Sequence, residues 1–196
     1  MGKIDPTIVI GGKLRSIHSN AKLGAGDYMV AEADESDGSF LKLIPTIAVI
    51  TNIDAEHLDY WTGGLPQIVD AFVDFANKVP FYGCSIVCVD HPVVQTILPR
   101  LEKRYITYGF SAQADFVAED VEVLEGAMAF NVRCRGELQG RIRLNIIGRH
   151  NILNALAAIV VAVEVGVSFD VIAESLSQFS GVGRRFEIKG CVQDIL

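Results

Sequence analysis

The stretch Pro45-Thr-Ile-Ala-Val-Ile-Thr-Asn-Ile-Asp54 decides the fold class. Its apolar part, Thr46 to Thr51, lacks the alternation of a half-exposed strand, which is typical of strands buried on both faces of a parallel sheet. Tyr28 to Ala31 and Ser85 to Val89 have the same character. Leu65 to Lys78, which precedes the last of these runs, repeats apolar residues at spacings of three and four, as an amphipathic helix does. This order predicts an α/β fold with a mostly parallel sheet flanked by helices.

The second half of the chain predicts a change of sheet type. After Asp90 we expect a helix with Pro92 in its first turn, and then a short strand from Arg104 to Tyr108. From Asp115 to Ile147 the pattern alternates between turn signals at Glu125-Gly126 and Arg135-Gly136. Such a pattern predicts a small antiparallel subsheet attached to the parallel one.

Two further helices are expected after the antiparallel strands. Asn151 to Val165 is nearly apolar all round and ends at Gly166. Ser168 is suited to cap a following helix that continues to Gln178. Both helices should pack back on the main sheet.

Composition sets the class of protein. The chain has 196 residues, half of them apolar and 21% charged, which is enough for one substantial core. Its net charge of −7 opposes binding to nucleic acid or to an anionic membrane. The N-terminus lacks an apolar secretion signal, and Ile152 to Val163 is shorter than the roughly 20 residues that span a bilayer. We therefore expect a cytoplasmic protein without nucleic-acid or membrane partners, whose cysteines are structural thiols.

Acidic clusters follow two of the predicted strands. Glu32-Ala-Asp34-Glu35-Ser36-Asp37 follows the first, and Asn52-Ile-Asp54-Ala-Glu56-His57-Leu-Asp59 follows the second. The carboxyl ends of strands in an open α/β sheet form the ligand crevice, so both clusters should face one site. Hard oxygen ligands suit Mg²⁺. Solvated acidic loops with capping aspartates are the alternative, and spacing alone slightly favours them.

His57 is a lone histidine, and such a residue is more often a surface or packing residue than a ligand. Here it follows a buried strand among Asp54, Glu56 and Asp59. A neutral imidazole at that place can assist a metal ion or a phosphate.

Two later segments suit a nucleotide. Gly148-Arg-His150-Asn151 leads into the apolar helix, and Asn154 lies on the same side of its first turn as Asn151. The alternative, that Asn151 caps the helix and His150 packs, is about equally well supported by the pattern. Gly181-Val-Gly183-Arg184-Arg185 places two guanidiniums after glycines, where they could stabilise a transferring phosphoryl group or simply lie on the surface.

In their order along the chain, these segments resemble the ATP-dependent Mur ligases of peptidoglycan synthesis. The matching stretches are Ala31 to Asp37 with Ser39-Phe40, Thr51 to Asp59, Gly148 to Ala155, and Gly181 to Phe186. The Glu-Ala-Asp-Glu-Ser-Asp form, Pro80-Phe-Tyr-Gly83 and Thr107-Tyr-Gly-Phe110 are most similar to the L-alanine-adding branch. The resemblance covers essentially the whole chain.

The resemblance implies the central, ATP-binding domain over residues 1–186, without its phosphate loop and first strand, and the start of a C-terminal domain over 187–196. For the complete protein it implies UDP-N-acetylmuramate and L-alanine as substrates and ATP and Mg²⁺ as cofactors. The implied site residues are Glu32 and His57 for the metal, Asp34, Glu35 and Ser36 for the substrate, His150, Asn151, Asn154 and Arg184 for ATP, and His57, Arg184 and Arg185 for catalysis.

The family reaction starts with phosphoryl transfer from ATP to the muramate carboxylate, and the amine of L-alanine then attacks the acyl phosphate. The chain has only Gly11-Gly12-Lys13-Leu14 where the family has its Gly-x-x-Gly-Lys-Thr loop. We therefore expect the chain alone to be inactive and to bind nucleotide weakly, and its exposed apolar surface could support a homodimer. Lys78, near the position of a carbamylated lysine in some family members, is assigned no metal role.

Three alternatives remain at this point. They are a Mur ligase that recycles muramyl tripeptide, a Mg²⁺-dependent phosphohydrolase with an aspartate nucleophile, and a non-catalytic interaction module with solvated acidic loops.

Overall fold

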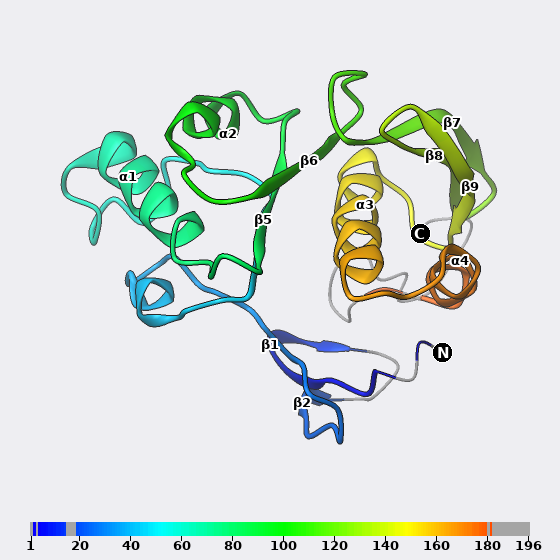
Figure 1. Cartoon of the computed structure of the whole chain (residues 1–196), viewed down its shortest axis with the longest axis horizontal. Coiled ribbons are helices and arrows are strands. Elements are labelled where there is room, and N and C mark those ends of the chain that lie inside the picture. The colour runs from blue at the N-terminus through cyan, green and yellow to red at the C-terminus, as the bar shows by residue number, and fades with distance from the viewer. Residues whose placement is uncertain (1, 3, 15–18, 180, 182–196) are drawn as a thin grey trace, which may run out of the picture.

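The computed structural model describes residues 2, 4–14, 19–179 and 181, and it contains a six-stranded sheet and a separate three-stranded sheet (Figure 1). The strands are β1 (Thr7–Leu14), β2 (Ser19–Lys22), β3 (Met29–Ala31), β4 (Ile47–Ile50), β5 (Cys84–Cys88), β6 (Tyr105–Gly109), β7 (Phe116–Leu124), β8 (Ala127–Cys134) and β9 (Glu137–Leu144). The helices are α1 (Gly64–Ala76), α2 (Pro92–Ile97), α3 (Arg149–Glu164) and α4 (Phe169–Ser177), with 3₁₀ turns η1 (Ser39–Lys42) and η2 (Leu98–Arg100).

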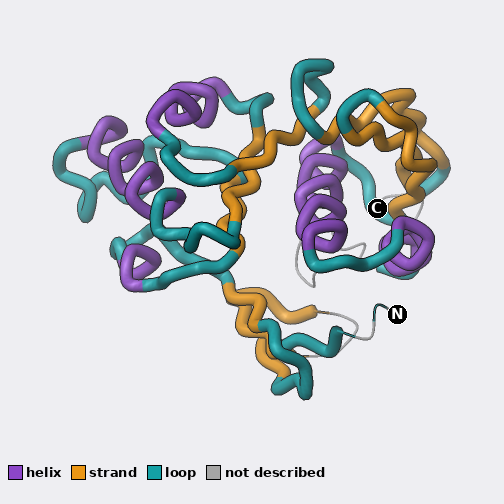
Figure 2. Tube along the Cα trace, viewed as in Figure 1, coloured by secondary structure: helices purple, strands orange, loops and turns teal. Residues whose placement is uncertain are grey.

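The parallel half of the large sheet is covered on both faces at β5, whereas the edge strand β4 buries only one face. The prediction that Thr46 to Thr51 is buried on both faces is therefore wrong for the face that carries Val49, which is 40% exposed. Strands β4, β5, β6 and β7 are parallel neighbours. On β5, Ile86 and Cys88 belong to the core shared with α3, whereas Val87 belongs to the core that contains α1 and α2. Figure 2 shows the helices on the two sides of these strands. The predicted α/β fold is confirmed, and burial of both faces explains why the run Ser85 to Val89 does not alternate.

The antiparallel half continues the same sheet through β7, β8 and β9. Its strands meet at the predicted turns. Arg135 and Gly136 both have positive φ angles, 48° and 87°, as the two central residues of a type I′ hairpin require. Helix α4 packs against β9, where Gly140 is needed because a Cβ there would lie 2.7 Å from the Phe169 ring. The small antiparallel subsheet is therefore confirmed.

The first predicted strand is in a different place from the one expected. We predicted Tyr28 to Ala31 as a strand buried on both faces of the main sheet, and this is wrong. Strand β3 is exposed along its length and pairs in parallel with β1 in the small sheet, which lies apart from the large one in Figure 1. An apolar run identifies a strand but not its partner, and here β1 supplies the hydrogen bonds through Thr7 and Val9.

The helices follow the sequence closely. Helix α1 starts one residue before the predicted Leu65, α3 contacts β5, β6 and β7, and Ser168 occupies the N-cap position of α4. Within the ranges that the structure describes, no helix is both long and apolar enough to cross a membrane.

Candidate functional site

The loops that follow β3 and β4 pack against each other. The Trp61 indole Nε1 donates a hydrogen bond to the Glu35 carbonyl oxygen over 3.0 Å. Gly38, with φ of 68°, lies so close to Tyr60 that a Cβ would stand 2.6 Å from its hydroxyl. Two segments about 20 residues apart in the sequence therefore form one surface.

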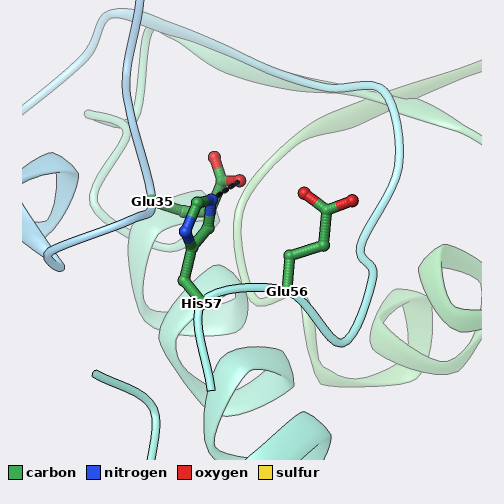
Figure 3. Close-up of side chains that lie close together, drawn as sticks. All are labelled: Glu35, Glu56 and His57. Atoms are coloured by element: carbon green, nitrogen blue, oxygen red, sulfur yellow. Dashed lines mark ion pairs between the residues drawn. The ribbon is translucent and has the colours of Figure 1, made fainter. Parts of the chain in front are cut away.

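Three side chains on this surface could share a metal ion. Glu35 comes from the first loop and Glu56 and His57 from the second, and their candidate ligand atoms all lie within 4.8 Å of one another (Figure 3). His57 Nε2 and Glu35 Oε1 lie 3.9 Å apart. His57 has a left-handed φ of 51°, which is uncommon for a residue other than glycine, and its ring points toward Glu35. Two carboxylates and an imidazole form a donor set for a divalent cation.

A polar hollow of about 170 Å³ adjoins the cluster at the carboxyl end of β4. Glu35 and Glu56 reach it from the two loops, and Phe72 reaches it from α1. The remaining lining is Ala33 and residues 49–54. Its place at a strand terminus is where open α/β sheets bind ligands.

The first acidic loop is held in a turn by its own carboxylates. Asp34 Oδ1 accepts a hydrogen bond from the Ser36 backbone N–H at 2.8 Å, and Asp37 Oδ1 accepts one from Ser39 at 2.9 Å. Hydrogen bonds from Ser36, first from its side chain and then from its backbone, hold the pKa of Asp34 below its usual value. Asp34 therefore stays ionised to a lower pH than an ordinary aspartate does.

Glu32 is placed differently from the other predicted metal residue. Its carboxylate accepts a hydrogen bond from the Gly11 backbone N–H at 2.5 Å, and it is not one of the three clustered side chains. The structure thus brings His57 to Glu35, which the family resemblance had assigned to the substrate.

Lys78, which was assigned no metal role, donates a hydrogen bond from its Nζ to the Leu41 carbonyl oxygen in η1.

The carboxyl ends of β5 and β6 extend the site toward α3. Asp90, just after β5, accepts hydrogen bonds from the backbone N–H groups of Phe110 at 2.7 Å and Ser111 at 3.1 Å. The Arg149 guanidinium carbon lies 4.1 Å from the centre of the Phe110 ring. Through Asp90, Phe110 and Arg149, the carboxyl ends of β5 and β6 are thus in contact with the first residue of α3.

Three of the four predicted nucleotide residues lie in the first turns of α3. His150 packs against Gly148, whose φ is 117° and where a Cβ would lie 2.7 Å from the imidazole. Asn151 donates from Nδ2 to the Ile147 carbonyl oxygen at 2.7 Å, so its side chain does not act as the predicted alternative N-cap. Asn154 is exposed one turn later. Arg184 and Arg185 lie outside the described residues.

Sequence reasoning missed Asp90, His91, Phe110 and Arg149. His91 Nε2 lies 3.3 Å from Asp54 Oδ1, so it connects β5 to the second acidic loop. The signal was present, because Asp90-His91 follows a buried strand just as the two acidic clusters do. Phe110 and Arg149 meet only through the tertiary fold.

Comparison with known proteins assigns this architecture. Residues 13–162 match the family model described as Mur ligase middle domain. A UDP-N-acetylmuramate--L-alanine ligase of Geobacter sulfurreducens is 55% identical over 194 residues, which cover 99% of this chain and 42% of that protein. The ligase of the same name from Trichlorobacter lovleyi is 58% identical over 95% of this chain and 41% of its own length. The chain thus spans about two fifths of the curated relatives it matches.

Solved structures give the same result. The UDP-N-acetylmuramate-alanine ligase of Thermotoga maritima superposes with a TM-score of 0.82 at 25% identity, covering 98% of this chain and 42% of that one. A UDP-N-acetylmuramate:L-alanyl-gamma-D-glutamyl-meso-diaminopimelate ligase from Neisseria has a TM-score of 0.80 at 26% identity, covering 92% and 59%. With its middle-domain match over three quarters of its length, the chain belongs to the Mur ligase family.

Proposed function

We propose that the chain is the ATP-binding part of a ligase that joins L-alanine to UDP-N-acetylmuramate in the cytoplasm. The observation that carries this proposal is sequence identity of 53–58% to relatives with that activity in their names, over 95–100% of the chain. Since the chain spans about 42% of those relatives, the activity is proposed for a longer protein. We propose residues 1–186 as the central domain and 187–196 as the start of the next.

A recycling ligase for muramyl tripeptide is the second candidate within the family. Backbone similarity does not separate the two, because the TM-scores of 0.80 and 0.82 are nearly equal at similar identity. The identity of more than half to L-alanine ligases favours the first candidate.

We propose that Mg²⁺ is held on the cluster of Glu35, Glu56 and His57, with Glu32 as the further ligand implied by the family resemblance. The donor set fits the ion, because Mg²⁺ prefers carboxylate oxygens and retains water and phosphate in its shell. When bound, the ion supplies positive charge that stabilises a transferring phosphoryl group. Without a cation, the ionised Asp34 and its acidic neighbours would repel the substrate carboxylate.

We propose that His150, Asn151 and Asn154 contact the adenine nucleotide. Asn151 donates to Ile147 through Nδ2, which leaves Oδ1 to accept a hydrogen bond from an amino group such as that of adenine. The first backbone N–H groups of α3 add partial positive charge. The glycine-linked Arg184 and Arg185 are proposed to approach the phosphates.

The proposed reaction has two steps. An oxygen of the substrate carboxylate attacks the γ-phosphorus of ATP and displaces ADP, which gives an acyl phosphate. The amine of L-alanine then attacks the acyl carbon, phosphate leaves, and the amine loses a proton. Asp34, Glu35 and Ser36 are proposed to line the place where the carboxylate is activated.

A chimera tests this function. The 194 residues of the Geobacter sulfurreducens ligase that match this chain would be replaced by the chain, and the purified chimera assayed for phosphate release with ATP and UDP-N-acetylmuramate. We expect release that depends on L-alanine and is lost in His57→Ala. Activity with the tripeptide instead of L-alanine would favour the recycling ligase. A trapped phosphoaspartate would favour a phosphohydrolase, and a folded, inactive chimera would favour an interaction module.

A further inference from the structure

The segment that carries two of the three clustered side chains is anchored at both ends and exposed between them. Ile53, 1% exposed, holds its beginning and Trp61, 4% exposed, holds its end. Residues 54–60 between these anchors are exposed. In the part of the chain that the structure describes, two side chains of the segment lie close to titratable groups of other elements: His57 is 3.9 Å from Glu35, and Asp54 is 3.3 Å from His91.

His91 is a fixed point of the fold. It follows β5, which is buried at every residue, and its carbonyl oxygen accepts a hydrogen bond from Gln95 at the start of α2. The preceding Asp90 is bonded to two backbone N–H groups after β6. The His91 side chain is 24% exposed, whereas that of Asp54 is 54% exposed. The less exposed residue, whose neighbours are hydrogen-bonded to the fold, can therefore constrain the exposed loop.

The contacts of the two ring nitrogens define how His91 binds. Nε2 faces Asp54 Oδ1 at 3.3 Å, and Nδ1 is buried without a partner among the described residues. A proton on Nδ1 would leave a buried donor unpaired, which is unfavourable. The neutral tautomer with its proton on Nε2 fits these contacts, because the Nε2 side of the ring is the side that faces the Asp54 carboxylate.

We propose that His91 is a positioning residue for the metal site: by its 3.3 Å contact with Asp54 it fixes the turn that presents Glu56 and His57 to the cation. This inference rests on the Mg²⁺ site proposed above. Partners that orient metal ligands typically contribute 10- to 100-fold to metal affinity. His91 touches neither the cation nor the substrate in this arrangement, because it acts through Asp54.

Two substitutions at His91 keep a polar amide side chain but place its nitrogen at different positions. In His91→Gln the amide nitrogen can reach the place of Nε2, whereas in His91→Asn it reaches only the place of Nδ1. We expect calorimetric titration of the 196-residue chain with MgCl₂ to give a dissociation constant raised about 10-fold in His91→Asn and less than about threefold in His91→Gln. Equal affinities in wild type and His91→Asn would overturn the proposal.

A double-mutant cycle shows whether the effect passes through Asp54. His91→Asn should weaken Mg²⁺ binding in the wild-type chain and have no further effect in Asp54→Asn. Asp70→Asn is the matched control, since it neutralises an exposed carboxylate that pairs with Arg100 on the surface of α1 and η2. Additive losses from His91→Asn and Asp54→Asn would overturn the proposed linkage.

Amide hydrogen exchange gives a readout that needs no metal. We expect faster exchange at residues 54–57 in His91→Asn than in His91→Gln, with unchanged exchange in β5. If the wild-type chain failed to bind Mg²⁺, the proposed metal site would fall, and exchange would still decide whether His91 fixes this turn. Identical exchange in both variants would overturn the positioning role.

Discussion

The indole N–H of Trp61 donates to the backbone carbonyl of Glu35 across 3.0 Å, and this bond ties the loop after β3 to the loop after β4. Trp61 is nearly buried and its ring meets that of Phe40 edge-on, with centroids 6.5 Å apart. The clustered carboxylates and imidazole depend on this connection, because β3 and β4 belong to different sheets.

Trp61→Phe should keep much of the packing and remove this bond. We expect the free energy of unfolding to fall by about 1–3 kcal/mol, since a part-buried carbonyl loses its donor and some apolar area is lost. Urea denaturation followed by circular dichroism measures the change. Tyr60→Phe, which alters an exposed neighbour, is the control and should change stability by less than about 0.5 kcal/mol. Equal stability of Trp61→Phe and wild type would contradict the role of the bond.

Gly38→Ala should be more damaging than another alanine substitution at the same backbone angle. Gly38 and Gly126 have φ angles of 68° and 67°, but a Cβ at Gly38 meets the Tyr60 hydroxyl, and one at Gly126 meets nothing within 4 Å. We expect about 1 kcal/mol of destabilisation for Gly126→Ala and about 2–3 kcal/mol for Gly38→Ala.

Thermal denaturation of both glycine variants provides the measurement. Adding Tyr60→Leu to Gly38→Ala should bring the loss back toward that of Gly126→Ala, because the hydroxyl that meets the new methyl group is removed. Similar losses for Gly38→Ala and Gly126→Ala would show that Tyr60 does not constrain the loop.

The ionisation of Asp34 should depend on Ser36. The pKa of Asp34 is lowered in the folded chain, so its contribution to stability is present above the unfolded pKa of about 3.9 and is lost as the pH falls through the lower folded value. Ser36→Ala removes the hydroxyl and should raise the Asp34 pKa toward its ordinary value. Carboxyl carbon chemical shifts followed by NMR between pH 2 and pH 6, a range of about ±2 around that value, measure the change. An unchanged titration would contradict the assigned cause.

The isolated chain should release no phosphate in an L-alanine-dependent manner. Its sequence lacks the Gly-x-x-Gly-Lys-Thr loop, whose backbone and lysine supply most phosphate contacts in such sites. A coupled assay with ATP, Mg²⁺, UDP-N-acetylmuramate and L-alanine measures the release, and the Geobacter sulfurreducens chimera is the positive control. Alanine-dependent release by the chain alone would show that this loop is dispensable.

Much of the local structure could be predicted because it depends on neighbouring residues. The apolar run Ser85 to Val89, the spacing in Leu65 to Lys78 and the Arg135-Gly136 turn each specify their element through period or permitted backbone angle. Acidic residues that directly follow predicted strands are also visible in the sequence, and they indicated the region of the candidate site.

The sequence by itself determined the α/β order of elements and the polar residues at the strand termini. Only the tertiary structure decided that β3 pairs with β1, that Glu35 and not Glu32 joins His57 in the cluster, and that Asp54 meets His91. Periodicity and backbone preference act over a few residues, so a sequence displays them directly. Strand partners and side-chain contacts depend on segments 20 or more residues apart, which become neighbours only when the chain is folded.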